Sequence, residues 1–154
     1  MSRGAAWRAA LAVAVAAVLG GCVPNLTSPA RTDGAYREKA ARTAGAGASS
    51  AATSELLATA AIDDGAFGPY LSVAIGDAER DLDDVSGTFS SILPPTRRSQ
   101  DLRDRLVTVL DRTADDVAEA RIAIRHGERA PLHDVRGRLQ DDADQLSAFE
   151  EQLS

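Results

Sequence analysis

The chain has 154 residues and a mass of 16.1 kDa; 44% of its residues are hydrophobic, 26% are charged and only 4% are aromatic. This length suits one domain, and the composition is too apolar for a disordered chain and too charged for a protein with several membrane spans. A single cysteine excludes an intramolecular disulfide. The net charge of −6 argues against nucleic acid as a partner, because nucleic-acid binding depends on basic patches.

The first 22 residues have the organisation of a bacterial signal peptide. Arg3 and Arg8 give a positive start, and an uncharged apolar run of 11 residues follows at 9–19. That length is typical of a signal-peptide core and is shorter than the ~20 residues that a membrane-spanning helix needs. The run leads into Leu19-Gly20-Gly21-Cys22, which resembles the lipobox of bacterial lipoproteins.

The resemblance to lipoproteins implies that Cys22 is the lipidation site. A diacylglyceryl group, with fatty acids such as palmitate, would be attached to its thiol, and the chain would be cut before it. The domains are then a signal peptide (1–21), a lipidated cysteine with a flexible tether (22–33) and a folded domain (34–154). The protein would lie at the extracytoplasmic face of the cell membrane, held there by the lipid on Cys22. The alternative is an ordinary secretory signal followed by a chance cysteine.

Cleavage would leave a more acidic protein on a short tether. Residues 1–21 contain two arginines and no acid, so the mature chain carries a net charge of −8. An anionic bilayer repels such a protein, and the lipid therefore has to supply the anchoring. Residues 23–32 contain two prolines and no hydrophobic periodicity, which is typical of a tether. Fully extended, this tether would reach about 35 Å.

The remainder of the chain predicts helix throughout, because β-branched residues are sparse and no stretch alternates between apolar and polar residues. The first segment runs from about 34 to 62, with Asp33 as its expected N-cap. Its centre, 44–52, consists of small residues, which allow a neighbouring helix to approach closely. We interpret it as a packed bundle helix; the alternative is a flexible or kinked region around Gly45 and Gly47.

The second segment begins at Phe67 or Pro69 and ends near Leu93, before Pro94 and Pro95. Its apolar residues recur every three or four positions, which predicts one buried helical face. They are Phe67, Leu71, Ile75, Ala78, Leu82, Val85, Phe89 and Ile92.

The third segment runs from about 100 to 126, with Ser99 as the expected N-cap and Gly127 as the residue that ends the helix. Its predicted apolar face includes Thr113. The other members of that face are Leu102, Leu106, Val109, Leu110, Val117, Ala120 and Ile124.

The fourth segment starts near Pro131 and carries leucines every seven residues. Val135 and Phe149 supply intermediate positions, and Ala143 stands beside Asp142 at another. A leucine heptad can form an intermolecular zipper, but Asp142 occupies a seam position and three other amphipathic segments are available as partners. We therefore expect packing within the chain and a monomeric soluble domain. The heptad leucines are Leu132, Leu139, Leu146 and Leu153.

Four amphipathic segments joined by short turns predict an all-α fold, an antiparallel up-and-down four-helix bundle. The sequence gives no sign of an enzyme, a cofactor or a metal site within it. From Asp77, the glycine and glutamate that a calcium-binding EF-hand loop requires are replaced by Leu82 and Thr88. His126 and His133 could meet across a turn, but we interpret His126 as a cation at the end of its helix and His133 as a residue of the first turn of the next segment, beside Leu132. The acids are expected on solvated faces: Asp77, Glu79, Asp81, Asp83, Asp84, Asp115, Asp116, Glu119, Asp141 and Asp144.

The folded domain also resembles small helical lipoproteins and secreted proteins of actinobacteria, through Phe67-Gly-Pro-Tyr-Leu71 and Thr88-Phe-Ser-Ser-Ile-Leu-Pro-Pro95. The resemblance implies a helical envelope protein and no activity. We therefore expect a membrane-tethered, non-catalytic interaction module with an unidentified envelope protein as partner. The alternative is a small-ligand carrier or sensor with a pocket between helices. A cavity of several hundred Å³ with convergent polar groups would favour the alternative.

Overall fold

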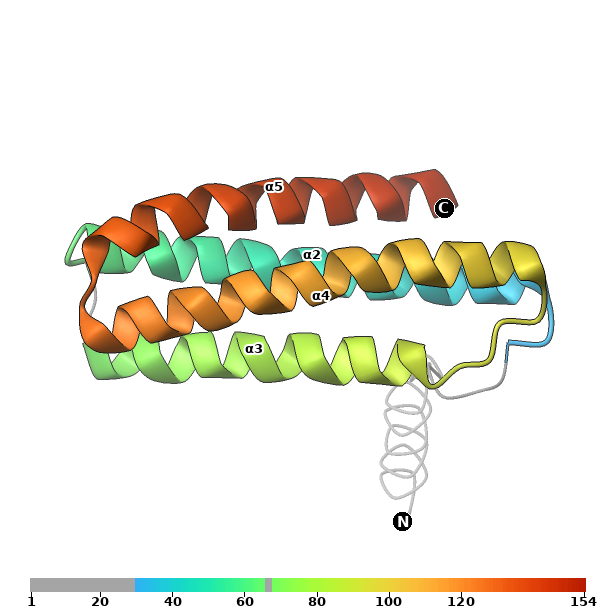
Figure 1. Ribbon diagram of the computed structural model, residues 1–154, viewed down its shortest axis with the longest axis horizontal. Coiled ribbons are helices and arrows are strands. Elements are labelled where there is room, and N and C mark those ends of the chain that lie inside the picture. The colour runs from blue at the N-terminus through green and yellow to red at the C-terminus, as the bar shows by residue number, and fades with distance from the viewer. Residues whose placement is uncertain (1–29, 66–67) are drawn as a thin grey trace, which may run out of the picture.

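The computed structural model describes residues 30–65 and 68–154, and in these ranges the chain forms four α-helices and no strand. Consecutive helices run in opposite directions (Figure 1), which confirms the predicted up-and-down four-helix bundle. Phe67 and the lipobox with Cys22 lie outside the described residues. The helices are α2 (Asp33–Ile62), α3 (Gly68–Ser90), α4 (Arg97–His126) and α5 (Arg129–Leu153).

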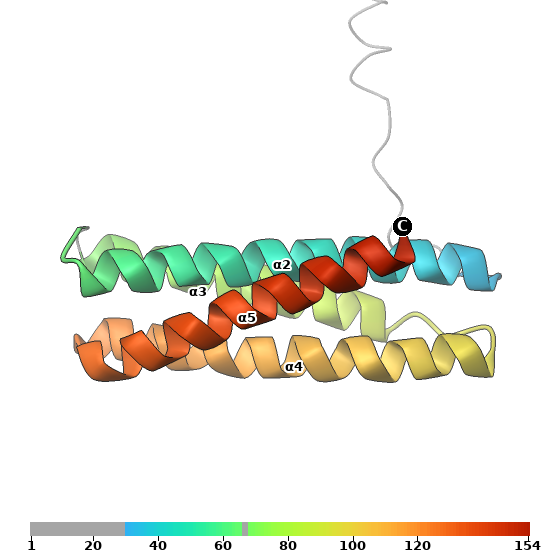
Figure 2. The same ribbon diagram turned by 90° about the horizontal axis from the view of Figure 1, so that it is seen from above.

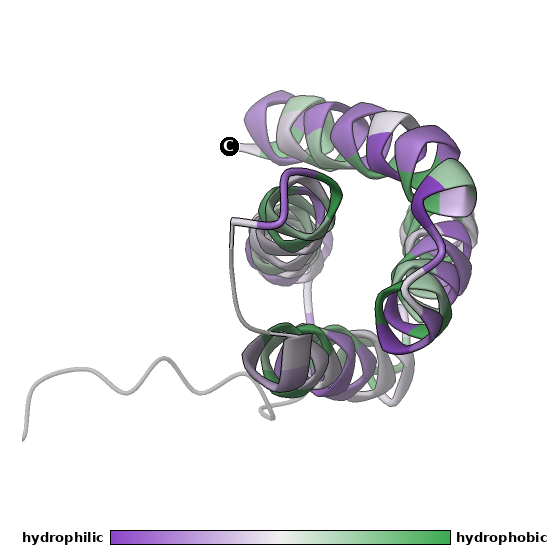
Figure 3. Cartoon of the chain, turned by 90° about the vertical axis from the view of Figure 1, so that its left-hand side faces the viewer, coloured by the Kyte–Doolittle hydropathy of each residue, from purple (hydrophilic) through white to green (hydrophobic). Residues whose placement is uncertain are grey.

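Helices α2 and α4 form the central pair of the bundle, because each of them contacts all three of the other helices. Helices α3 and α5 lie on opposite sides and do not touch each other. Figure 2 shows α5 crossing obliquely from the end of α4 to the start of α2, and Figure 3 shows the bundle end-on. None of the helices in the described ranges is both long enough and apolar enough to cross a membrane.

The small residues of α2 explain how α5 comes so close to it. Gly47 faces the core, where an added Cβ would lie 2.8 Å from Leu110 of α4 and 3.3 Å from Leu146 of α5. Gly45 faces Glu150 of α5 in the same way. Helix α2 is continuous over 30 residues without a break at the two glycines, and it packs its small residues against α4 and α5, as expected of a bundle helix.

The two predicted N-caps are corrected by the structure. Thr32 caps α2 by accepting a hydrogen bond from the backbone N–H of Ala35 (3.2 Å), and Thr96 caps α4 in the same way from Ser99 (3.2 Å). Asp33 and Ser99 lie inside the first turns instead, where the Ser99 hydroxyl donates to Asp33 Oδ1 at 2.6 Å. The side chains expected to cap two helices therefore connect the starts of those helices to each other.

The other helix ends lie at the predicted positions or within a few residues of them. Helix α3 ends at Ser90 rather than near Leu93, which is 82% exposed in the connection to α4. Gly127 ends α4 with φ +67°, in the left-handed conformation expected of a glycine at that position. Helix α5 begins at Arg129, and Pro131 lies in its first turn, where a proline is tolerated.

The predicted apolar faces form the core. Ala30, which belongs to the expected tether, is also buried in it, whereas Arg31 and Thr32 are exposed. Thr113 is fully buried, as expected, and donates to the backbone carbonyl of Val109. Asp142 occupies the seam position, as expected, and is only 1% exposed, whereas its neighbour Ala143 is partly exposed. The largest fully buried apolar side chains are Tyr36, Ile75, Leu82, Phe89, Leu106, Leu110, Leu132, Leu139 and Leu146.

Candidate functional site

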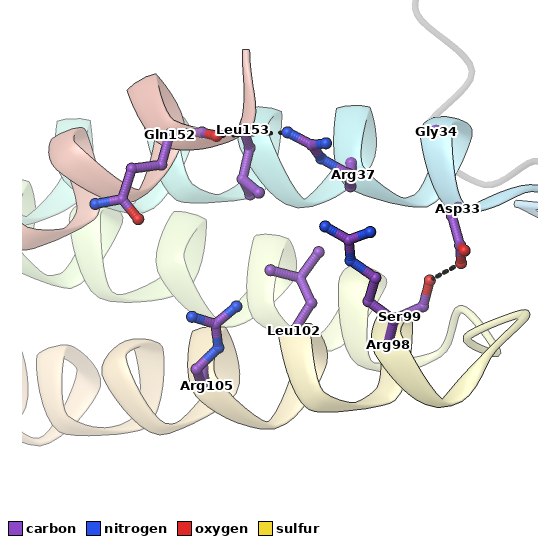
Figure 4. Close-up of a pocket in the computed structure, with 9 residues that line it drawn as sticks. All are labelled: Asp33, Gly34, Arg37, Arg98, Ser99, Leu102, Arg105, Gln152 and Leu153. Atoms are coloured by element: carbon purple, nitrogen blue, oxygen red, sulfur yellow. Dashed lines mark hydrogen bonds between the residues drawn. The ribbon is translucent and has the colours of Figure 1, made fainter.

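A pocket of about 350 Å³ opens where the first turns of α2 and α4 meet the last turn of α5 (Figure 4). We call it the arginine pocket. Two buried residues of α4, Ser99 and Leu102, lie on its inner side. Its lining residues are Asp33, Gly34, Arg37, Arg98, Ser99, Leu102, Arg105, Gln152 and Leu153.

Three guanidinium groups extend into this region from two helices. Figure 4 shows Arg98 and Arg105 pointing from α4 toward α2 and α5, and Arg37 pointing from α2 toward the end of α5. Arg98 and Arg105 are seven residues apart, so the helical repeat places them on one face of α4. Arg37 joins them only because α2 and α4 lie side by side at this end.

The partners of these arginines leave most of their hydrogen-bonding capacity free. The Arg37 guanidinium donates to the backbone carbonyl of Gln152 at 3.4 Å, and the Arg105 guanidinium lies 5.7 Å from the centre of the Phe149 ring. Within residues 30–65 and 68–154, no carboxylate forms an ion pair with Arg37, Arg98 or Arg105. A guanidinium carries five N–H donors, so donors remain for an added oxyanion.

Asp33 is the acidic residue among those that line the pocket. Its Oδ1 accepts hydrogen bonds from the hydroxyls of Ser99 and Thr96, both at 2.6 Å. These bonds, first that of Ser99, lower the pKa of Asp33, and the nearby charge of Arg98 adds to the effect. Asp33 is therefore ionised at neutral pH, and the three arginines leave the pocket with a net positive charge.

A second polar cluster lies in the α4–α5 interface. Both helices carry the pattern Arg-x-x-Asp-Asp, at 112–116 and at 138–142, and because the helices are antiparallel each arginine reaches the other helix. Arg112 Nε donates to Asp142 Oδ1 at 2.8 Å, and Arg138 Nε donates to Asp116 Oδ1 at 2.6 Å. The Oδ2 atoms of both aspartates are buried and have no hydrogen-bond partner among the described residues.

The burial of Asp116 corrects the expectation of a solvated side chain; its side chain is only 9% exposed. The sequence did contain a signal for it, since Asp116 stands three residues after Thr113 and four before Ala120, which are both buried. The environment of Asp142, which interacts with Asp116 from α5, is also unusual. Burial raises the pKa of Asp142, and Asp116 raises it further, whereas Arg112 lowers it.

The remaining acids expected on the surface are not brought together into a site. On α3, Glu79 is partly buried and pairs with Arg121 of α4 at 2.7 Å, and the other acids are exposed. His126 and His133 are both exposed. No group of three or more His, Cys, Asp or Glu in the described ranges could hold a metal ion.

The sequence matches no known protein-family model, and no curated protein or solved structure is similar to it at a significant level. The arginine pocket offers cationic donors beside an apolar residue, Leu102, and this arrangement suits the binding of an anion. The sequence did not predict the pocket. The seven-residue spacing of Arg98 and Arg105 places both on one face of a helix, but it does not show that Arg37 joins them.

Proposed function

We propose that the protein is a lipid-anchored, non-catalytic interaction module at the extracytoplasmic face of the cell membrane, with another envelope protein as its partner. The observation that carries this proposal is the position of Cys22, the single cysteine of the chain, at the end of a lipobox. Because α2 begins only 11 residues later, the anchor would hold the start of α2 within about 35 Å of the bilayer.

This tether would orient the bundle. The starts of α2 and α4, together with the arginine pocket, would lie near the membrane. The opposite end, formed by the α2–α3 connection, would project outward. Leu56, Tyr70 and Val73 are exposed there, whereas Leu93, the most exposed large apolar side chain of the described residues, lies at the end near the membrane. Exposed apolar residues favour contact with another protein.

Replacement of the cysteine tests the anchor. Cys22→Ala is expected to abolish lipidation, so that most of the protein leaves the membrane fraction of the native host. Thr27→Ala, in the tether but outside the lipobox, is the matched control and should remain membrane-bound. The lipoprotein proposal is wrong if the Cys22→Ala protein stays in the membrane to the wild-type extent and neither form has a processed N-terminus.

Site-specific photo-crosslinking tests the interaction. A photoreactive amino acid at Tyr70 should give a discrete crosslinked product in cells that make the anchored protein. The same amino acid at Asp83, an exposed position of α3 in a charged stretch, is the control. Equal labelling at the two positions, or none at either, would contradict an interaction surface at this end.

The second candidate function is that of a carrier or sensor for a small ligand. The arginine pocket favours it, since its volume of about 350 Å³ falls in the range of ligand sites and polar groups from three helices line it. This function is compatible with the anchor but does not depend on it. The test is a binding measurement on the purified protein with a probe of a defined ligand class.

A further inference from the structure

We infer that the arginine pocket binds a phosphate group. The inference rests on the second proposed function, that the pocket takes a small ligand, and adds the chemistry of that ligand. It does not need the lipid anchor. The observations that support it are the donor set, the balance of charge and the apolar residues beside the arginines.

The donor set fits a phosphate. The planar forks of Arg98 and Arg105 extend from one face of α4, and Arg37 reaches the same region from α2 (Figure 4). Arginine binds phosphate by paired N–H donors, and a tetrahedral oxyanion can accept from several such groups at once. A cavity of about 350 Å³ leaves room for the phosphate and for the organic group that it is esterified to.

The charge balance at this end of the bundle also favours an anion, although the chain as a whole is acidic. Asp33 opposes binding, because the hydroxyls of Ser99 and Thr96 donate to its Oδ1 and favour its charged form. Glu150 of α5 lies in the neighbouring groove and also opposes binding. Against these stand three arginines and the positive ends of the α2 and α4 dipoles, because both helices begin here. The negative end of α5 lies at the same place and offsets part of the dipole contribution, so the arginines supply most of the positive charge.

The apolar contacts distinguish the pocket from a simple patch of charge. Leu102 is buried between the turns that carry Arg98 and Arg105, and Leu153 closes the side formed by α5. The organic part of a phosphate ester would pack on these leucines. Two sources supply such a group, a free phosphate ester or the headgroup of an anionic phospholipid, and the shared chemistry is the phosphate itself.

Titration with inorganic phosphate tests the inference directly. The protein is a chain of residues 22–154 carrying Cys22→Ala, which keeps every residue that the structure describes. At constant ionic strength, the Nε–H signals of Arg98 and Arg105 in nuclear magnetic resonance spectra are expected to move in a saturable manner. Arg98→Gln should weaken the binding about tenfold. Arg125→Gln changes the net charge equally at the exposed far end of α4 and should leave the binding unchanged.

A variant that should bind phosphate more tightly distinguishes an effect on the pocket from damage to the fold. Asp33→Asn removes the opposing charge but keeps the Oδ1 acceptor for Ser99 and Thr96, so phosphate affinity is expected to rise severalfold. Misfolding could not produce this gain. The absence of saturable shifts in the wild-type protein, or equal losses in Arg98→Gln and Arg125→Gln, would overturn the inference. Shifts with acetate but not with phosphate would also overturn it, while the pocket would remain a ligand site.

Vesicles distinguish the two sources. Vesicles of phosphatidylcholine alone and vesicles that also contain phosphatidylglycerol are sedimented with the same unanchored protein. If the source is a phospholipid headgroup, the protein co-sediments only with the second kind, and Arg98→Gln releases it whereas Arg125→Gln does not. Binding of inorganic phosphate without co-sedimentation supports a free phosphate ester. Co-sedimentation that Arg98→Gln and Arg125→Gln reduce equally would contradict a specific pocket.

Discussion

Asp116 of α4 and Asp142 of α5 interact across the helix interface, and each holds a buried Oδ2 atom that receives no hydrogen bond from the described residues. Their Oδ1 atoms are neutralised by arginines from the opposite helix, Arg138 and Arg112. Two carboxylates offer only acceptors to each other, so a proton or an amide is needed to connect them. Each carboxylate is therefore well paired through its Oδ1 atom, whereas its Oδ2 atom lacks a hydrogen-bond donor among the described residues.

Asp142→Asn is expected to stabilise the protein at neutral pH. The amide oxygen can continue to accept from Arg112, and its NH₂ group can donate to Asp116 Oδ2, so a buried acceptor gains a partner. We expect the free energy of unfolding to rise by about 1 kcal/mol. Chemical denaturation of residues 30–154, which contain all four helices, measures it.

Asp141→Asn is the matched control for this substitution. Asp141 is exposed beside Asp142, and its replacement changes the net charge equally. We expect it to alter stability by no more than about 0.5 kcal/mol. A destabilising effect of Asp142→Asn, with no effect of Asp141→Asn, would show that the full charge on Asp142 is required for pairing with Arg112.

The pH dependence of stability should show two opposite contributions. The pKa of Asp142 is raised above its ordinary value of 3.8, mainly by burial, so the native state favours its protonated form. Its contribution is present at acidic pH and is lost as pH rises from 3.8 through the raised pKa. The pKa of Asp33 is lowered by Ser99 and Thr96, so its contribution is present above 3.8 and is lost as pH falls through the lowered pKa.

Thermal unfolding across this range separates the two groups. Asp142→Asn should remove the loss of stability above pH 3.8, and Asp33→Asn should remove part of the loss below it. If Asp142→Asn left the slope of stability against pH unchanged above pH 3.8, the raised pKa of Asp142 would not be the cause of that slope.

Gly45 and Gly47, two residues apart on α2, should respond in opposite ways to replacement by alanine. At Gly45 the new Cβ would meet the carboxylate oxygens of Glu150 at 2.6 Å, and this flexible end can move into solvent. Gly45→Ala is therefore expected to stabilise the protein by up to about 1 kcal/mol through helix propensity.

At Gly47 the added methyl would press against two fully buried leucines, Leu110 and Leu146. Overpacking a core costs about 1–3 kcal/mol, which exceeds the gain in propensity. Gly47→Ala should lower the thermal midpoint, whereas Gly45→Ala should raise it. If both substitutions raised it, the side chains of α4 and α5 would not approach α2 at Gly47 as closely as the structure has it.

The sequence predicted the helices and their buried faces, because these depend on spacing within one segment. The regular recurrence of Leu71, Ile75, Ala78, Leu82 and Phe89 defines the inner face of α3 without knowledge of its neighbours. The small centre of α2 likewise predicted close packing, although its apolar stripe is weak.

The caps and polar sites could not be predicted in the same way, because they depend on contacts between helices. Asp33 and Ser99 are good capping residues, but their side chains hydrogen-bond to each other once α2 and α4 lie side by side. The burial of Asp116 likewise requires Arg138 of the opposite helix, 22 residues away. The arginine pocket combines side chains of two helices with the end of a third, and no local pattern contains that information.

The heptad leucines of α5 give the last prediction, a monomeric soluble domain. Leu132, Leu139 and Leu146 are buried within their own bundle, and Leu146 packs beside Gly47 of α2. An intermolecular zipper would have to withdraw them from α2 and α4 and expose the faces that they cover. Residues 30–154 should therefore sediment as a monomer at micromolar concentration.

Leu146→Asp distinguishes the two arrangements. In the monomer, it places a carboxylate without a partner in an apolar core, a cost of several kcal/mol that should unfold the chain and abolish its helical circular dichroism. Ser147→Asp, at the exposed neighbouring position, is the control and should stay folded. A wild-type dimer that Leu146→Asp converts into a folded, helical monomer would contradict packing within the chain, because the leucine would then have been covered by a second copy.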